Sequence, residues 1–320
     1  MYFNKITSIL FSSLLVLLFS GCSSDSKEDS KATEVNVIVS TYALYDISKN
    51  ILKDKVELKT VLPFGSDAHS YELSPKKVAS IQDADLFVYS GASLEPWISR
   101  FSTSKSLDMS KYVKLIHLSD HDHHHDHKHE HEEHDAHHEH SHDADKMAVD
   151  PHYWLDIENM KTMTEVLAAE FIKLSPKNKE FFESNKKSYL KKLDEMKSSY
   201  DQSFKECKKD TIVVNHNAFS YLGKRYGFEI EAVSGLSNDS MPSPKDIKHV
   251  MHLIEEKNIS VIFFESFASD KIIKSIANDT GVKVDTLHPL GNITKDQQGM
   301  SYKQIMDQNI EKIKQALECR

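Results

Sequence analysis

Residues 175–204 read SPKNKEFFESNKKSYLKKLDEMKSSYDQSF and carry a long helical pattern. Ser175 and Pro176 are typical of a helix start, because the first turn of a helix does not need the N–H that proline lacks. Beyond them, apolar residues recur at a helical spacing of three to four positions. These residues are Phe182, Tyr189, Leu193, Met196, Tyr200 and Phe204. The stretch therefore predicts a helical rod of about thirty residues, about 45 Å long at about 1.5 Å per residue.

Short β-rich runs alternate with helical stretches on both sides of this rod. Before it, we expect strands at 35–39, 56–62, 86–89 and 112–117, and helices at 44–52, from 74, at 95–101 and at 159–174. After it, we expect strands at 211–215, 229–233, 260–264 and 282–287, and helices at 218–226, 244–257, 270–280 and 302–317. This order predicts an α/β fold of two lobes, each with a mainly parallel sheet flanked by helices, joined by the long rigid helix. One continuous α/β domain is the alternative.

The amino terminus is expected to be an export signal. Residues 1–5 are weakly basic, residues 9–19 are apolar, and Ser20-Gly21-Cys22 follows, which resembles the bacterial motif whose cysteine is lipidated. The apolar run is too short to span a bilayer, and an ordinary cleaved signal is the alternative. The expected segments are a lipoprotein signal peptide (1–22), a tether (23–34), an N-terminal lobe (35–157), connecting helices (158–209) and a C-terminal lobe (210–320).

A histidine tract, residues 121–142, holds twelve of the nineteen histidines, interleaved with acidic residues. Its histidines are His121, His123, His124, His125, His127, His129, His131, His134, His137, His138, His140 and His142. Residues 120–145 contain ten Asp or Glu and one Lys, a local charge of −9 that equals the charge of the whole chain. The rest of the chain is therefore neutral, which argues against a nucleic-acid partner. Imidazole is a ligand for zinc, copper and nickel, so we expect a flexible loop that binds metal weakly; a solvated charged loop is the alternative.

Three cysteines occur, and Cys22 is assigned to the lipid anchor. In an exported protein, Cys207 and Cys319 can form a disulfide or remain two unpaired thiols, and the sequence leaves both open. There is no Cys-x-x-Cys spacing, so a cysteine zinc site is not supported.

Three histidines outside the tract occupy turns at the carboxyl ends of expected strands or loops beside them. His69 lies in FGSDAHSYE (64–72), His152 in DPHYWLD (150–156) and His216 in NHNAFSY (215–221). In open α/β sheets, ligands bind in the crevice outside those strand ends, so the placement favours a binding site. His117, His249 and His252 have no comparable motif.

These three motifs, in this order, resemble the substrate-binding proteins of metal-uptake ABC transporters, and the resemblance extends from about residue 35 to the C-terminus. The resemblance implies two lobes joined by a rigid helix, with an ion bound in the cleft between them. It also implies that His69 and His152 come from the first lobe and His216 from the second. Manganese members usually carry a carboxylate where this chain has His216. Three neutral imidazoles suit Zn²⁺ better than Mn²⁺, so zinc is the expected metal, with nickel and copper as alternatives that also accept imidazole.

A fourth ligand is less well defined by the sequence. Residues 286–292, TLHPLGN, resemble the relevant turn of the family, but Gly291 stands where some relatives carry Glu. His288 is the candidate we would test, with Glu265 and a water molecule as alternatives. Three carboxylates close to the motifs are expected either to orient metal-bound imidazoles or to serve as caps and surface charge. They are Glu72, Asp150 and Asp156.

The expected function is therefore capture of zinc outside the cytoplasm and its delivery to the membrane permease of an ABC importer, by a lipid-anchored and monomeric protein. A lipid-anchored metal buffer or sensor is one alternative, and a secreted zinc hydrolase is another, because catalytic zinc also has three protein ligands. The chain lacks a serine nucleophile elbow, and its one His-Glu-x-x-His spacing, at 138–142, lies in the histidine tract and not on an expected helix, which argues against an enzyme.

Overall fold

The computed structural model describes residues 35–100, 103–118, 148–235, 242–265 and 271–320. Residues 34–320 form one compact unit. The expected signal peptide with Cys22, the tether and the histidine tract lie outside the described residues. No helix in the ranges given above is long and apolar enough to cross a membrane.

The first sheet has four parallel strands in the order β2-β1-β3-β4. The strands are β1 (Asn36–Val39), β2 (Glu57–Thr60), β3 (Leu86–Tyr89) and β4 (Ser106–Asp108). The central strands β1 and β3 are almost entirely apolar and buried, as expected when helices cover both faces of a sheet. The edge strand β4 was not predicted, because its three residues contain one apolar side chain and no periodic signal.

Short helices connect these strands. They are α1 (Tyr42–Leu52), α2 (Pro75–Gln82) and the 3₁₀ helices η1 (Pro96–Arg100) and η2 (Met109–Lys111). Helix α2 begins where the Ser74-Pro75 pair predicted, and the Ser74 hydroxyl accepts a hydrogen bond from the Lys77 amide (3.3 Å). The helix expected at 95–101 is only the 3₁₀ turn η1.

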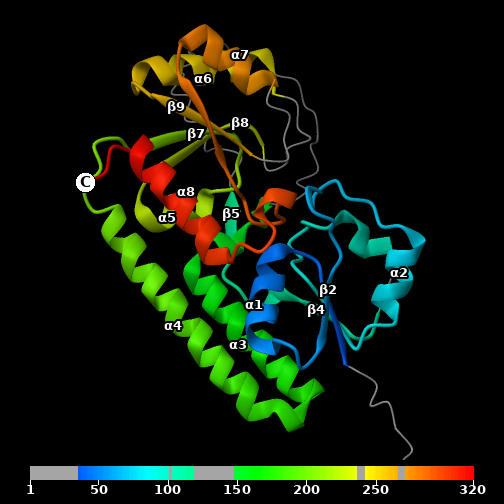
Figure 1. The fold of residues 1–320 in the computed structure, drawn as a ribbon. Helices are drawn as coiled ribbons and strands as arrows, with labels where there is room; N and C mark the ends of the chain where they lie inside the picture. Colours follow the sequence, from blue (N-terminus) through cyan, green and yellow to red (C-terminus); the bar gives the residue numbers. More distant parts are fainter. Residues whose placement is uncertain (1–34, 101–102, 119–147, 236–241, 266–270) are drawn as a thin grey trace, which may run out of the picture. The chain divides into compact units, whose positions relative to one another are not determined.

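The second sheet repeats the design, with parallel strands in the order β10-β9-β7-β8. Its strands are β7 (Thr211–His216), β8 (Glu229–Ser234), β9 (Val261–Glu265) and β10 (Lys283–Leu287). Its helices are α5 (Ser220–Tyr226), α6 (Pro244–Glu256), α7 (Lys271–Thr280), η5 (Lys295–Gln297) and α8 (Tyr302–Ala316). In Figure 1, α6 and α7 cover one side of this sheet, and α6 contacts β8 while α7 contacts β9 and β10.

A small ribbon departs from the expected parallel pattern. The strand expected at 112–117 forms only at β5 (Ile116–Leu118), which pairs in antiparallel fashion with β6 (Ala148–Asp150). This pairing joins residues on either side of the histidine tract, which no local periodicity reveals. Its effect is to place the segment that follows β6 beside the first sheet, where Tyr153 donates a hydrogen bond to the Ser90 carbonyl (2.8 Å).

The long helix predicted at 175–204 is present as a 3₁₀ turn, η4 (Pro176–Asn178), followed by α4 (Lys179–Ser203). It lies beside α3 (Ile157–Leu174), as Figure 1 shows, and also contacts α1 and α8. Tyr189 of α4 donates a hydrogen bond to Asp46 of α1 (2.7 Å), and Tyr200 donates one to Asp307 of α8 (2.7 Å). The predicted fold, two parallel sheets flanked by helices with a long helix between them, is confirmed.

The hydrophobic interior is shared between the two sheets. One cluster of buried residues runs from α1 through α3 and α4 to α8. Two smaller clusters lie within single sheets, one under α6 and α7 and one under α2. Both sheets therefore pack against one shared hydrophobic interior, to which α4 also contributes side chains.

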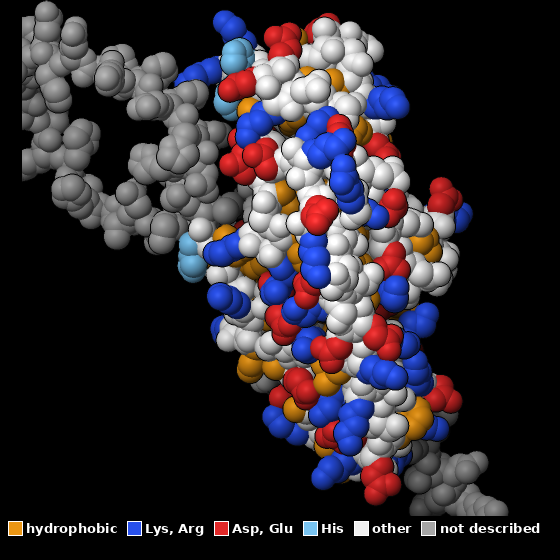
Figure 2. All heavy atoms as spheres, turned by 90° about the vertical axis from the view of Figure 1, so that its left-hand side faces the viewer, with side chains coloured by type: hydrophobic (Ala, Val, Ile, Leu, Met, Phe, Trp, Pro, Cys, Tyr) orange, Lys and Arg blue, Asp and Glu red, His pale blue; other side chains and the backbone are white. Residues whose placement is uncertain are grey.

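The C-terminus is fastened to the segment after α4. Cys207 and Cys319 form a disulfide between positions 112 residues apart. The Arg320 amide also donates a hydrogen bond to the Glu206 carbonyl (2.9 Å). On the face shown in Figure 2, lysines and acidic residues are interspersed. Lys186 of α4 pairs with Glu165 (3.0 Å) and Glu183 (2.8 Å).

Candidate metal centre

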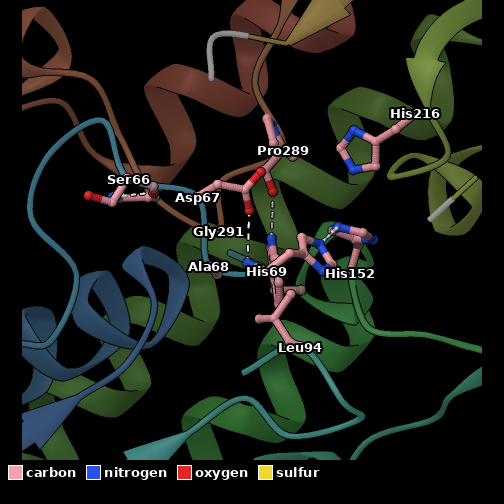
Figure 3. Close-up of a pocket in the computed structure, with 11 residues that line it drawn as sticks. Ser66, Asp67, Ala68, His69, Leu94, His152, His216, Pro289 and Gly291 are labelled. Carbon is pink, nitrogen blue, oxygen red and sulfur yellow. Dashed lines mark hydrogen bonds between the residues drawn. The ribbon is translucent and has the colours of Figure 1, made fainter. Parts of the chain in front are cut away.

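Three different elements bring histidines together. His69 lies in the loop between β2 and α2, His152 follows β6 at the start of η3 (Tyr153–Leu155), and His216 is the last residue of β7. Each ring offers one nitrogen as a ligand atom, and these three nitrogens lie within 4.8 Å of one another. Figure 3 shows the three rings directed at a common point. Within the described residues, this is the one group of three or more such side chains that could hold a metal ion.

The spacing of the first two rings matches a zinc site. The Nε2 atoms of His69 and His152 are 3.2 Å apart. Two nitrogens bound to one Zn²⁺ at about 2.05 Å with a tetrahedral angle are about 3.3 Å apart. The third nitrogen lies within 4.8 Å of the others, so His216 would move by up to about 1.5 Å to complete the same geometry.

Buried carboxylates hold two of the rings from behind. Asp150, which is fully buried, lies 2.8 Å through Oδ1 from Nδ1 of His152. Glu265, at the end of β9, contacts Nδ1 of His216, and both side chains are 1% exposed. Because each Nδ1 faces a carboxylate, each Nε2 is left to face the metal position. Of the carboxylates considered from the sequence, Asp150 is therefore placed to orient an imidazole.

Glu265 reaches His216 because of the sheet register. Val214 of β7 is paired with Phe263 of β9, and His216 and Glu265 each lie two residues further along these parallel strands. The carboxyl ends of neighbouring parallel strands meet at one edge, so the two side chains become neighbours. From the sequence, Glu265 was a candidate metal ligand only, because its role as the partner of His216 depends on the strand order β9-β7.

A repeated Asp-x-His pattern shapes the backbone at two of the histidines. Asp67 Oδ1 accepts a hydrogen bond from the His69 amide (2.9 Å), and Asp150 Oδ1 accepts one from the His152 amide (2.9 Å). Each aspartate thereby fixes a turn that begins two residues before the ligand. Asp67 was missed in the sequence analysis, although the shared spacing of Asp67-Ala68-His69 and Asp150-Pro151-His152 was a signal for it.

The electrostatics shift the pKa values of His69 and His216 in opposite directions. Burial, and next the neighbouring His152, lower the pKa of His69 to about 3. For His216, burial acts to lower the pKa, but attraction and hydrogen bonding by Glu265, helped by Asp67 and Asp150, raise it above its usual value. A cation would therefore meet a His69 that is already deprotonated and would compete with a proton at His216.

The three histidines line a small pocket of about 310 Å³, a volume that includes the part of the pocket open to solvent. Its lining residues are Ser66, Asp67, Ala68, His69, Leu94, His152, Trp154, His216, Pro289, Gly291 and Asn292. The Trp154 indole N–H donates to the Pro289 carbonyl (2.7 Å), and the Trp154 ring meets the His152 ring edge-on. The space that the centre of a water-sized particle can occupy is only about 20 Å³, little more than one water molecule needs, which suits an ion better than an organic substrate.

His288 is not brought into the group of three histidines. It follows β10, and its backbone is held on both sides by Asn309, which accepts from the His288 amide (3.0 Å) and donates to the His288 carbonyl (2.7 Å). Burial, with repulsion from Lys312, lowers its pKa to about 4. Its neighbours Pro289 and Gly291 line the pocket instead. A ligand role for His288 remains a prediction that this placement does not support.

The other candidates have ordinary structural roles. Asp156 caps α3 by accepting from the Glu158 amide (2.8 Å) and forms an ion pair with Arg225 (2.6 Å). Glu72 is exposed and lies 3.7 Å from Arg100. His117 is exposed on β5, and His249 and His252 lie on α6 near Glu231 and Glu256.

Comparison with known proteins relates this chain to zinc-uptake proteins. The family model described as "Zinc-uptake complex component A periplasmic" matches residues 37–316. The chain is 34% identical over 320 residues to the high-affinity zinc uptake system protein ZnuA of Bacillus subtilis, with 98% of each chain covered. It is 30% identical over 317 residues to the zinc-binding lipoprotein AdcA of Streptococcus pneumoniae, covering 97% of this chain but only 61% of that protein.

A solved structure supports the same comparison. The Zn(II)-bound ZnuA-like domain of AdcA from Streptococcus pneumoniae superposes with a TM-score of 0.71 at 27% identity. The superposition covers 89% of this chain and 99% of that domain.

Proposed function

Since the chain belongs to the family of periplasmic zinc-uptake components, we propose that it captures Zn²⁺ outside the cytoplasm and delivers it to the permease of an ABC importer. His69, His152 and His216 would bind the ion as neutral imidazoles. The observation that carries this proposal is the convergence of three imidazoles within 4.8 Å. The zinc-bound solved relative adds independent support for the choice of metal.

The surrounding carboxylates explain how a neutral triad can hold a dication. Asp150 and Glu265 are buried against His152 and His216, and Asp67 lies in the same pocket. Their negative charges offset the charge of the ion, while the atoms that meet it remain imidazole nitrogens. Mn²⁺ prefers direct carboxylate ligands, so this arrangement favours Zn²⁺.

Three protein ligands also suit a cargo that must leave again. His288 lies outside the triad, and Gly291 contributes no side chain to the pocket. We infer that a water molecule or another exchangeable ligand completes the coordination of zinc. An incomplete protein cage would let the ion pass to the permease without dismantling four protein bonds.

Further parts of the proposal concern residues outside the described ranges. We propose that Cys22 carries a lipid anchor, that residues 23–34 form the tether, and that the histidine tract collects zinc weakly near the site. The lobe boundaries at 35–157 and 210–320, the connecting segment 158–209 and a monomeric state belong to the same proposal.

Titration calorimetry with Zn²⁺ and Mn²⁺ tests the proposal on the mature protein with and without residues 120–145. We expect one tight zinc event and weak manganese binding in both forms, with additional weak zinc events only when the tract is present. His216→Ala should abolish the tight event, whereas His252→Ala, on exposed α6, should leave it unchanged. Loss of tight binding on removal of the tract would make the tract the principal site, and the protein a metal buffer.

A further inference from the structure

The loop that carries His69 is bonded to a segment from the other end of the chain. Residues 288–293 follow β10 of the second sheet, and Asn292 lies there with 8% of its surface exposed. Its side-chain Nδ2 donates to the Pro63 carbonyl (2.6 Å) and to the Ser66 carbonyl (2.8 Å). The Gly65 amide donates to the Ile293 carbonyl (3.0 Å). Loop 63–69 is therefore tied to residues 292–293 by three hydrogen bonds.

The Asn292 amide is fully engaged in this contact. Its two N–H groups serve two carbonyls of the loop, and its Oδ1 accepts from the Ile293 amide (2.8 Å). An asparagine side chain offers two donors and one acceptor group, so each kind is used. The side chain also lines the metal pocket.

The partner segment is itself held firmly, which lets it act as an anchor. The Tyr42 amide, at the start of α1, donates to the Gly291 carbonyl (2.9 Å), and Trp154 donates to the Pro289 carbonyl (2.7 Å). Asn309 of α8 holds the backbone of His288. Loop 63–69, in contrast, contains no helix or strand of its own.

We propose that Asn292 is a positioning residue that holds the His69 loop closed on the metal and thereby sets the rate of zinc release. The proposal rests on the proposed zinc-binding function. His69 is the least buried of the three histidines, so it is the ring that separates first when the loop opens. Opening the loop requires the two hydrogen bonds donated by Asn292 to break. When they form again, the Nε2 atom of His69 returns to 3.2 Å from the Nε2 atom of His152.

The test compares Asn292→Leu with wild type in the full mature chain. Leucine has a similar size but cannot donate, so loss of two net hydrogen bonds should speed zinc release on the order of tenfold. Stopped-flow mixing of the zinc-loaded protein with excess chelator measures that rate. Asn292→Gln, which keeps both donors on a longer side chain, should restore part of the wild-type rate. Asn292→Ser, which keeps one donor, serves if Asn292→Leu fails to fold.

Asn309→Leu is the matched control, because it removes another amide that holds the same segment but does not reach loop 63–69. Because it loosens the anchor without breaking a bond to the loop, it should speed release much less than Asn292→Leu does. If it speeds release as much as Asn292→Leu does, general loosening of the segment is the cause and the proposal is overturned. An unchanged release rate in Asn292→Leu would overturn it as well.

Hydrogen exchange in the metal-free protein separates this proposal from the proposed function. The amides of residues 64–71 should exchange faster in Asn292→Leu than in wild type, with no metal involved. A wild-type chain that binds no zinc tightly would refute the proposed function and the release role with it. Tight wild-type binding with unchanged loop exchange and release in Asn292→Leu would refute the positioning role alone.

Discussion

A buried carboxylic acid beside the metal pocket should make the stability of the protein depend on pH. Glu95 is 2% exposed and follows Leu94, which lines the pocket. Its carboxyl accepts hydrogen bonds from Ser40 Oγ (2.5 Å) and from the amides of Ser90 (2.8 Å) and Gly91 (2.9 Å). Burial raises the pKa of Glu95 to about 7, with a small further rise from Asp108, against the lowering effect of these hydrogen bonds.

The size and sign of the effect follow from the two pKa values. The difference between about 7 in the folded protein and 4.5 corresponds to about 3 kcal/mol, at about 1.36 kcal/mol per pKa unit. Because the folded pKa is raised, this contribution to stability is fully present below 4.5 and is lost as the pH rises through about 7. Glu95→Gln removes the titration and should remove this decline.

Urea unfolding of wild type and Glu95→Gln at about pH 4.5 and about pH 8 measures the effect. The difference in unfolding free energy between the two proteins should change by about 3 kcal/mol between these conditions, in favour of the variant at the higher pH. Glu72→Gln, at a carboxylate that is 79% exposed, should give parallel curves. Parallel curves for Glu95→Gln too would show that Glu95 does not titrate in this range, and the reasoning from burial would be wrong.

Three further predictions concern the site and the covalent link. Glu265→Gln should weaken zinc binding by about 10- to 100-fold at alkaline pH, because His216 loses the partner that orients it; calorimetry measures this, and unchanged affinity would contradict the role. Lowering the pH should weaken zinc binding first through His216, because its raised pKa lets a proton occupy the metal-facing nitrogen. His69, with a pKa of about 3, should release no proton when zinc binds. Calorimetry in buffers of different ionisation enthalpy counts the protons released on binding, and Glu265→Gln should reduce that count. Replacing Cys207 and Cys319 by serine should lower the unfolding free energy by about 2 to 4 kcal/mol, and a melt of the wild type under reducing conditions should match the variant if the disulfide is responsible.

Some parts of the structure were easy to predict because they depend on local pattern. Helix α4 was predicted from its apolar spacing, and α2 from the Ser74-Pro75 pair. Strands β4, β5 and β6 have three residues each, which is too short for periodicity to show. The antiparallel pairing of β5 and β6 is a contact across the histidine tract, so only the folded chain displays it.

The sequence by itself determined the alternation of strands and helices, the long connecting helix and the three histidine motifs, because each is a short-range pattern of residue types. It also made zinc the expected metal, because the family resemblance implies that His216 stands where manganese members carry a carboxylate. Only the tertiary structure decided how these parts meet. The order β9-β7 sets Glu265 against His216, and the path after β10 ties Asn292 to the His69 loop while leaving His288 outside the triad. These contacts join residues far apart in the chain, and strand order and register, which place them, are properties of the packed sheets.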